Sequence, residues 1–185
     1  MGLFGFGKSN DEKVSHLHHK GVNLGKKERF EEALECYNEA ISIDPEVWGL
    51  WFSKGSALSE LGRFEEALEC YNEATIVDAW KIRWEAWFCK GQVLSHLGRY
   101  EETFECFDEA IKIDRTNPDF WTWKSFALEK LGRHEEALTC VNEVIRLGPE
   151  NSDSWHGKGL ILKKLERHEE SEQCFAKAKE LGYVK

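Results

Sequence analysis

The sequence has no long apolar run and no excess of positive charge. Its 185 residues hold no stretch close to the roughly 18 to 20 apolar residues of a membrane span, and the N-terminus lacks the apolar core of a secretory signal. The formal net charge is -9, whereas nucleic-acid backbones bind clustered Lys and Arg. We therefore expect a cytoplasmic protein with no membrane span and no nucleic-acid partner.

The sequence also lacks the residue patterns of an enzyme site. No Ser-His-Asp, Cys-His or paired-carboxylate arrangement stands out, and each Glu-Glu pair is explained by the start of a helix, where acids suit the helix dipole. His16, His18 and His19 have no acidic or Cys partners at the spacing of metal ligands, so we interpret them as solvated. We expect no catalysis, no cofactor and no metal.

One short pattern supports an alternative hypothesis. Gly2, Gly7, Lys8 and Ser9 match G-x-x-x-x-G-K-[ST], which binds phosphates through backbone N–H groups between a strand and a helix. No strand can precede residue 2, so a nucleotide-binding enzyme is the less favoured interpretation. Titration with ATP and magnesium would distinguish the two.

The sequence is organised around one stretch that recurs. Residues 61–78, LGRFEEALECYNEATIVD, have near-copies at 27–44, 97–114, 131–148 and 165–182. Aligned on Gly21, Gly55, Gly91, Ser125 and Gly159, the units are 14–47, 48–83, 84–117, 118–151 and 152–185. Each unit holds two apolar patterns of helical spacing around a break, which predicts a helical hairpin that buries its apolar face against its neighbours.

These units resemble tetratricopeptide repeats (TPR) over residues 14–185. A bulky residue occupies repeat position 4, as Leu17, Trp51, Trp87, Trp121 and Trp155. Position 24 holds Tyr37, Tyr71, Phe107, Val141 and Phe175, and position 27 holds Ala40, Ala74, Ala110, Val144 and Ala178. The resemblance implies an all-α, right-handed solenoid of about ten helices that binds proteins.

Three boundary predictions follow from the repeat alignment. Residues 1–13 belong to no repeat and are interpreted as a flexible tail, with Asn10 or Asp11 capping the first helix. Two extra residues within 79–83 are expected to lengthen a helix or loop and to expose part of Trp80. The outer faces of the end repeats are polar, at His16, Asn23, Lys27, Glu172 and Lys179, so we expect them to meet water and the five repeats to form the whole array.

Two further columns recur in all five units. Position 23 holds Cys36, Cys70, Cys106, Cys140 and Cys174, which we interpret as small, buried, reduced residues; redox control or metal binding is the alternative, and Cys89 lies outside the column. The hairpin turn holds Arg29, Arg63, Arg99, Arg133 and Arg167. We expect these arginines to pair with acids across the hairpin rather than to form a phosphate site.

The resemblance places the binding surface on the first helices of the repeats. In the family, positions 2, 5, 9, 12 and 13 line a concave groove. The candidate groove residues here are Phe52, Glu60, Glu85, Phe88, Gln92, Asp119, Phe126, Glu129 and His156. The three phenylalanines would form an apolar strip flanked by these acids and Asp153, suited to a peptide or helix with hydrophobic anchors and some Lys or Arg. Alternatively, they fill the bottom of a narrow groove.

The N-terminal tail is itself a possible groove ligand. Leu3, Phe4 and Phe6 are large apolar residues without a core of their own, and Lys8 would meet the groove's acids. We therefore keep self-association through the tail as a hypothesis, beside a disordered tail and shallow membrane contact.

Overall fold

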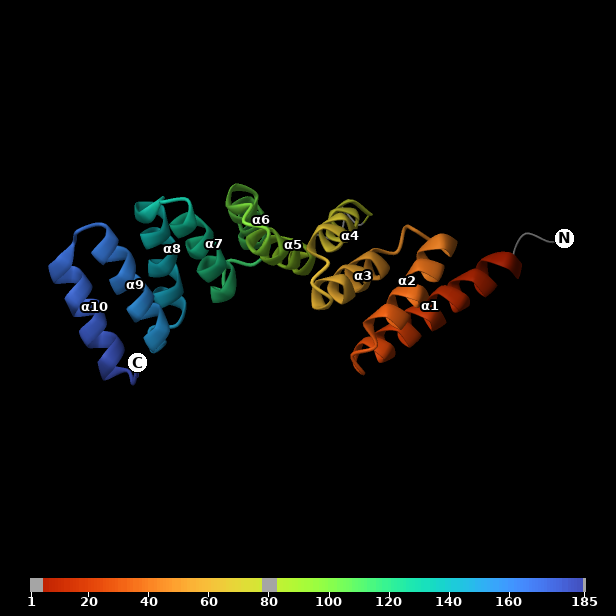
Figure 1. The fold of residues 1–185 in the computed structure, drawn as a ribbon, viewed down its shortest axis with the longest axis horizontal. Coiled ribbons are helices and arrows are strands. Elements are labelled where there is room, and N and C mark those ends of the chain that lie inside the picture. Colours follow the sequence, from red (N-terminus) through yellow and green to blue (C-terminus); the bar gives the residue numbers. More distant parts are fainter. Residues whose placement is uncertain (1–4, 78–82, 185) are drawn as a thin grey trace. The chain divides into compact units, whose positions relative to one another are not determined.

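A computed structural model describes residues 5–77 and 83–184, with side chains described from residue 10 onward, and these residues form ten α-helices (Figure 1). The helices are α1 (Gly5–Gly25), α2 (Phe30–Ile43), α3 (Trp48–Glu60), α4 (Phe64–Val77), α5 (Trp84–His96), α6 (Tyr100–Ile113), α7 (Pro118–Lys130), α8 (His134–Leu147), α9 (Ser152–Lys164) and α10 (His168–Glu180). The chain divides into two compact units, Met1–Leu97 and Gly98–Lys185.

Helices pack in sequence order within each unit. In the first unit α1 packs against α2, α2 against α3, α3 against α4 and α4 against α5. In the second unit the same succession runs from α6 to α10. Contacts made mainly between neighbours are what a repeat array predicts. The predicted fold class, an all-α solenoid of five TPR-type helical hairpins, is confirmed.

A small residue and an aromatic ring join the two helices of a hairpin. A Cβ atom added to Gly55 would lie 2.9 Å from Cε1 of Tyr71, and one added to Gly159 would lie 2.6 Å from Cε1 of Phe175. Gly21 and Tyr37 approach equally closely, at 2.5 Å. Glycine at position 8 therefore lets the ring at position 24 lie directly on the first helix.

A tryptophan at position 4 holds the linker that precedes its helix. Its indole Nε1–H donates to the backbone carbonyl six residues earlier, which is repeat position 32. The three described bonds run from Trp51 to Pro45 (2.8 Å), from Trp121 to Arg115 (3.2 Å) and from Trp155 to Pro149 (2.8 Å). The backbone carbonyl accepts this bond whether position 32 is Pro or Arg, so the loss of proline does not remove the contact.

The turn inside each hairpin needs one residue in the left-handed backbone conformation. Gly62, Gly98 and Gly132 have φ of 71°, 72° and 72°, a region that glycine enters without steric cost. Repeats one and five place Glu28 and Glu166 there, with φ of 59° and 60°. The first and last turns are therefore strained where the inner three are not.

The turn arginines pair differently from the prediction. Each binds the second Glu of the helix that it precedes, through two hydrogen bonds, as Arg63 Nε and an Nη atom do with Glu66 at 2.6 Å. The same pairs are Arg29–Glu32, Arg99–Glu102, Arg133–Glu136 and Arg167–Glu170. The expected pairing across the hairpin is wrong, because a Glu three residues ahead lies within reach of the planar guanidinium.

The N-terminal helix begins earlier than its capping signals predicted. Helix α1 starts at Gly5 rather than near Asn10 or Asp11, so residues 5–13 of the predicted tail are helical. Adding a residue to an existing helix adds one hydrogen bond, which extends α1 past its candidate caps. Lys13 in this segment pairs with Glu39 of α2 at 2.8 Å. The predicted irregularity around Trp80 lies outside the described residues.

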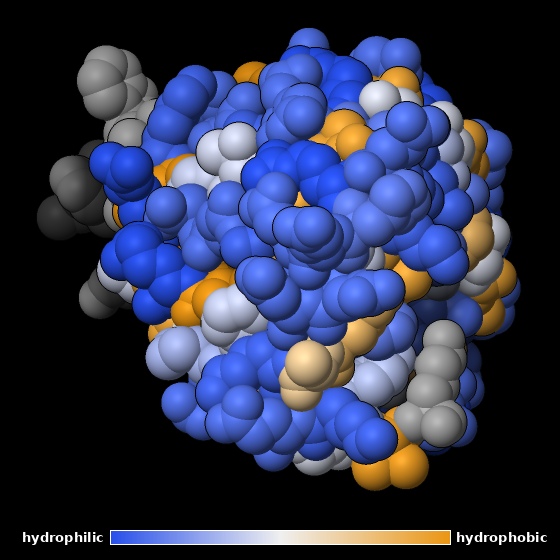
Figure 2. Space-filling view, turned by 90° about the vertical axis from the view of Figure 1, so that its left-hand side faces the viewer, coloured by the Kyte–Doolittle hydropathy of each residue, from blue (hydrophilic) through white to orange (hydrophobic). Residues whose placement is uncertain are grey.

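The outer faces of the end repeats are polar, as predicted. His16 and Asn23 on α1 and Lys27 in the turn after it are exposed, whereas Leu50 and Ala57 of α3 are buried at the places equivalent to His16 and Asn23. Glu172 and Lys179 are exposed on α10, and the end of the second unit seen in Figure 2 is largely hydrophilic.

Candidate functional site

The candidate groove residues of the first unit pack largely into their own layers. Phe52 of α3 is half-buried, with its ring 5.3 Å from that of Trp48 and 5.9 Å from that of Tyr71. Phe88 of α5 is half-buried beside Trp84, at 6.2 Å. Glu60 is exposed, and Glu85 and Gln92 are half-buried. Phe52 and Phe88 thus pack on aromatic residues of their own repeats, and their part in a groove stays a prediction.

Phe126 in the second unit is different, because it is a large aromatic residue on the surface. Its side chain is 40% exposed. The ring meets the edges or faces of Tyr100 and Trp123 at about 6 Å, and Lys130 Nζ lies 5.1 Å from its centroid. Phe52 and Phe88 belong to one unit and Phe126 to the other, so the continuous strip stays a prediction.

A pocket of about 390 Å³ opens beside Phe126, between α7, α8 and α9. Its apolar wall is formed by Val141, Val144 and Ile161, with Phe126 at the edge. Asp119, Glu129 and Asp153 supply its acids. Three of the candidate groove residues, Asp119, Phe126 and Glu129, therefore line one hollow.

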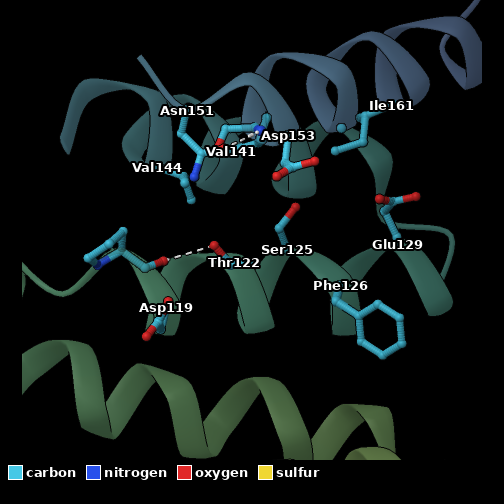
Figure 3. A pocket seen from close by; sticks show the side chains of 13 residues that line it. Asp119, Thr122, Ser125, Phe126, Glu129, Val141, Val144, Asn151, Asp153 and Ile161 are labelled. Carbon is cyan, nitrogen blue, oxygen red and sulfur yellow. Dashed lines mark hydrogen bonds between the residues drawn. The ribbon is translucent and has the colours of Figure 1, made fainter. Parts of the chain in front are cut away.

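The side chains around this hollow do not all point the same way. Figure 3 shows Ser125, Glu129 and Asp153 pointing into the space between α7 and α9, whereas Asp119 and Phe126 point away from α9. Glu129 already pairs with Lys164 of α9, with 2.6 Å between Nζ and Oε2. The acidic character inside the pocket therefore comes mainly from Asp153.

His156, the last candidate groove residue, lies apart from this pocket. Its ring stacks on Tyr183 at 4.1 Å and packs near Phe175 at 5.3 Å. It lines a second hollow with Phe175, Lys179, Gly182, Tyr183 and Val184. The residues that follow α10 therefore partly cover this candidate site residue.

The pocket walls include residues that the groove positions missed. Val141 and Val144 belong to the second helix of repeat four, and Ile161 is repeat position 10, which faces the core. The signal that could have found them was already present: Val141 replaces the ring, and Ser125 replaces the glycine, at positions where the other repeats keep both.

The cysteine column is buried, as predicted. The five residues are 3 to 5% exposed. Burial raises the pKa of Cys70 and of Cys140 to about 11, in each case against the opposing effect of a nearby lysine. Cys89 is half-buried, and burial also raises its pKa. All six cysteines are free thiols.

The histidines near the N-terminus correct one expectation. His18 is not solvated: it is half-buried, its Nε2 lies 3.0 Å from Ser53 Oγ, and burial together with His19 lowers its pKa. His16 and His19 are exposed. Within the described ranges there is no group of three or more His, Cys, Asp or Glu placed to hold a metal ion.

The Gly-Lys-Ser match lies in a helix. Gly7, Lys8 and Ser9 fall within α1, which runs without a break from Gly5, whereas Gly2 lies outside the described residues. A phosphate loop needs its backbone N–H groups free of helical hydrogen bonds. In the described part of the chain, no helix is both long enough and apolar enough to cross a membrane.

The class of protein follows from the repeats and from family models. Models described as tetratricopeptide repeat match residues 20–81, 84–117, 106–139 and 152–181. The chain therefore belongs to the tetratricopeptide repeat family.

Individual relatives are similar in sequence over a short stretch or in fold over most of the chain. The uncharacterized protein MJ0572 of Methanocaldococcus jannaschii is 42% identical over 48 residues, which span 26% of this chain and 56% of that protein. A crystal structure of MamA superposes with a TM-score of 0.87 at 18% identity, covering 92% of each chain. MamA from Desulfovibrio magneticus gives 0.84 at 17% identity, covering 91% of this chain and 94% of its own.

YrrB has a similar fold, and its crystal structure is that of a TPR protein with an unusual peptide-binding site. The TM-score is 0.83 at 18% identity, over 96% of this chain and 92% of YrrB. At these identities the likeness concerns the fold.

Proposed function

We propose that this protein is an interaction scaffold that binds a peptide or helix of a partner protein on the groove face of its first helices, without catalysis. The exposed aromatic ring of Phe126 beside an apolar, acid-edged pocket carries the proposal. A large exposed aromatic residue next to a concave apolar surface is typical of a protein-binding site. The peptide-binding site of YrrB, a protein of the same fold, supports it.

The proposed compartment is the cytoplasm. Six free thiols, five of them buried, suit a compartment that keeps cysteine reduced. The partner would carry hydrophobic anchors and some Lys or Arg, since the chain is acidic overall and acids edge the pocket.

The test compares partner capture by three purified proteins: wild type, Phe126→Ala and Ile76→Ala. Ile76 is 67% exposed on α4 and outside the candidate groove, so Ile76→Ala controls for loss of an exposed apolar side chain. Partners retained from lysate are identified, purified and titrated by calorimetry. We expect binding about tenfold weaker for Phe126→Ala and unchanged for Ile76→Ala. Equal affinity of all three would contradict the proposal.

Self-association through Leu3, Phe4 and Phe6 remains a second proposal. Leu3 and Phe4 lie outside the described residues, and Phe6 lies in α1, where side chains are described only from residue 10. Sedimentation of wild type and of a variant with all three residues changed to Ser decides it. A mass that is the same for both proteins at every concentration would end this proposal.

A further inference from the structure

Repeat four departs from the packing rule that holds in repeats one, two and five. In repeats one, two and five, a Cβ atom at position 8 would lie within 3 Å of the ring at position 24, so the glycine and the ring depend on each other. Repeat four has Ser125 and Val141 at these positions. Ser125 carries the Cβ atom that the ring would exclude, and its Oγ donates to the carbonyl of Ala137 at 3.1 Å.

The missing ring leaves the space that becomes the pocket. Val141 is too short to cover α7, and Ser125 and Val141 both line the hollow. Gly157 of α9 widens it from the opposite side, since a Cβ atom added there would meet no atom within 4 Å. Gly157 occupies repeat position 6, where repeat four carries Trp123 in α7. A large side chain is therefore compatible with this position of the first helix.

The volume and the lining residues of the pocket indicate what part of a ligand it can bind. About 390 Å³ is at the small end of ligand pockets, which suits part of a peptide rather than a whole helix. Val141, Val144 and Ile161 are at most 7% exposed and form a rigid apolar wall. Burial of one large apolar side chain is the interaction that such a wall favours.

The charged residues at the opening of the pocket indicate which peptide residue would lie next to the buried apolar side chain. Glu129 is engaged by Lys164, whereas Asp153 is exposed and has no ion pair within residues 10–77 and 83–184. Asp153 points into the space between α7 and α9 (Figure 3). A Lys or Arg beside the buried side chain would meet this carboxylate.

We propose that the pocket formed by Ser125, Val141 and Gly157 is a specificity site for one large apolar side chain of a partner peptide, with Asp153 binding an adjacent Lys or Arg. The proposal rests on the proposed function and names the chemistry of its ligand. Repeat four is thereby the repeat that selects the partner sequence.

The experiment uses a random peptide library displayed on phage and selected against the full-length wild type. The enriched peptides are synthesised with a fluorescent label, and their affinities are measured by polarisation. Two variants fill the pocket by independent routes. Gly157→Trp places in α9 the residue that α7 carries as Trp123, and the double variant Ser125→Gly, Val141→Phe restores the pair found in repeat five.

Two further variants serve as matched comparisons. Ile76→Ala removes an exposed apolar side chain outside the pocket and is expected to bind like wild type. Asp153→Asn keeps the shape and removes the charge. Circular dichroism and thermal unfolding establish that each variant is folded.

We expect enriched peptides to share one large apolar residue next to Lys or Arg. Both pocket-filling variants should bind them at least about tenfold more weakly. Asp153→Asn should weaken binding about threefold to tenfold and reduce its dependence on salt.

Peptides that bind equally well to both folded pocket-filling variants but lose affinity for Phe126→Ala would overturn the pocket and leave the proposed function standing. Enrichment of acidic or wholly polar peptides would overturn the assigned ligand chemistry. Failure to enrich any peptide would contradict the specificity pocket. The interaction scaffold would be contradicted only if no partner were captured either.

Discussion

Replacing the strained glutamate of the last hairpin turn by glycine should stabilise the protein. Glu166 has φ of 60°, and Gly62, Gly98 and Gly132 occupy the same place in the inner repeats. Its side chain is exposed and has no ion pair or hydrogen bond among residues 10–77 and 83–184. Glu166→Gly therefore changes the backbone energy of the turn while removing no described side-chain contact.

Two opposing effects set the magnitude. The left-handed conformation costs an L-residue about 1 to 2 kcal/mol. Glycine loses more conformational entropy on folding, by roughly 0.5 to 1 kcal/mol. The free energy of unfolding should rise by about 0.5 to 1 kcal/mol, which for a chain of this size raises the unfolding temperature by about 1 to 4 °C.

Urea unfolding followed by circular dichroism measures the change, and hydrogen exchange in α10 reports it locally, since repeat arrays do not always unfold in one step. Gly132→Glu in the equivalent turn of repeat four is the reverse substitution and should destabilise by a similar amount. If Glu166→Gly lowered stability, or Gly132→Glu left it unchanged, the backbone argument would be refuted.

Three more predictions test the packing. Gly159→Ala should lower the free energy of unfolding by about 1 to 3 kcal/mol, because its Cβ would lie 2.6 Å from Phe175; urea unfolding without a loss would contradict the close approach. Trp121→Phe should lower it by about 0.5 to 1.5 kcal/mol through loss of the bond to the Arg115 carbonyl, and thermal unfolding identical to wild type would show that this bond contributes nothing. The thiols of Cys70 and Cys140, whose pKa is raised from 9.0 to about 11, should react slowly with a disulfide reagent at pH 8. Rapid reaction of the folded protein at pH 8 would contradict burial. Because the folded state disfavours the thiolates of Cys70 and Cys140, the stability that these thiols contribute is complete below pH 9 and is lost as the pH rises through about 11.

The cysteine column shows why much of the fold could be predicted. Cys36 and its four equivalents recur on the apolar face of a helix in every unit, and the structure buries all five. The exposure of His16 at one end and Glu172 at the other was predicted in the same way. Such inferences succeed because helical periodicity is local, and because a repeat can bury its face only against the next repeat.

The candidate site was harder to predict. Family positions placed Phe52, Phe88 and Phe126 in one class, yet Phe126 is 40% exposed and lines a pocket, whereas Phe52 is half-buried and packs on Trp48 and Tyr71. The periodicity that assigns a face does not specify how deep a ring lies on it. That depth depends on the neighbours that each ring meets.

Spacing along single chain segments was enough to predict the repeat, the helical hairpins, the burial of the cysteines and the polar ends. The packing of helices against one another was needed to learn that His18 lies beside Ser53, and that Val141, Ile161 and Asp153 surround one hollow. Most of these contacts join residues from different helices, and the space left by the ring absent at position 141 becomes visible only when the helices around it are packed together.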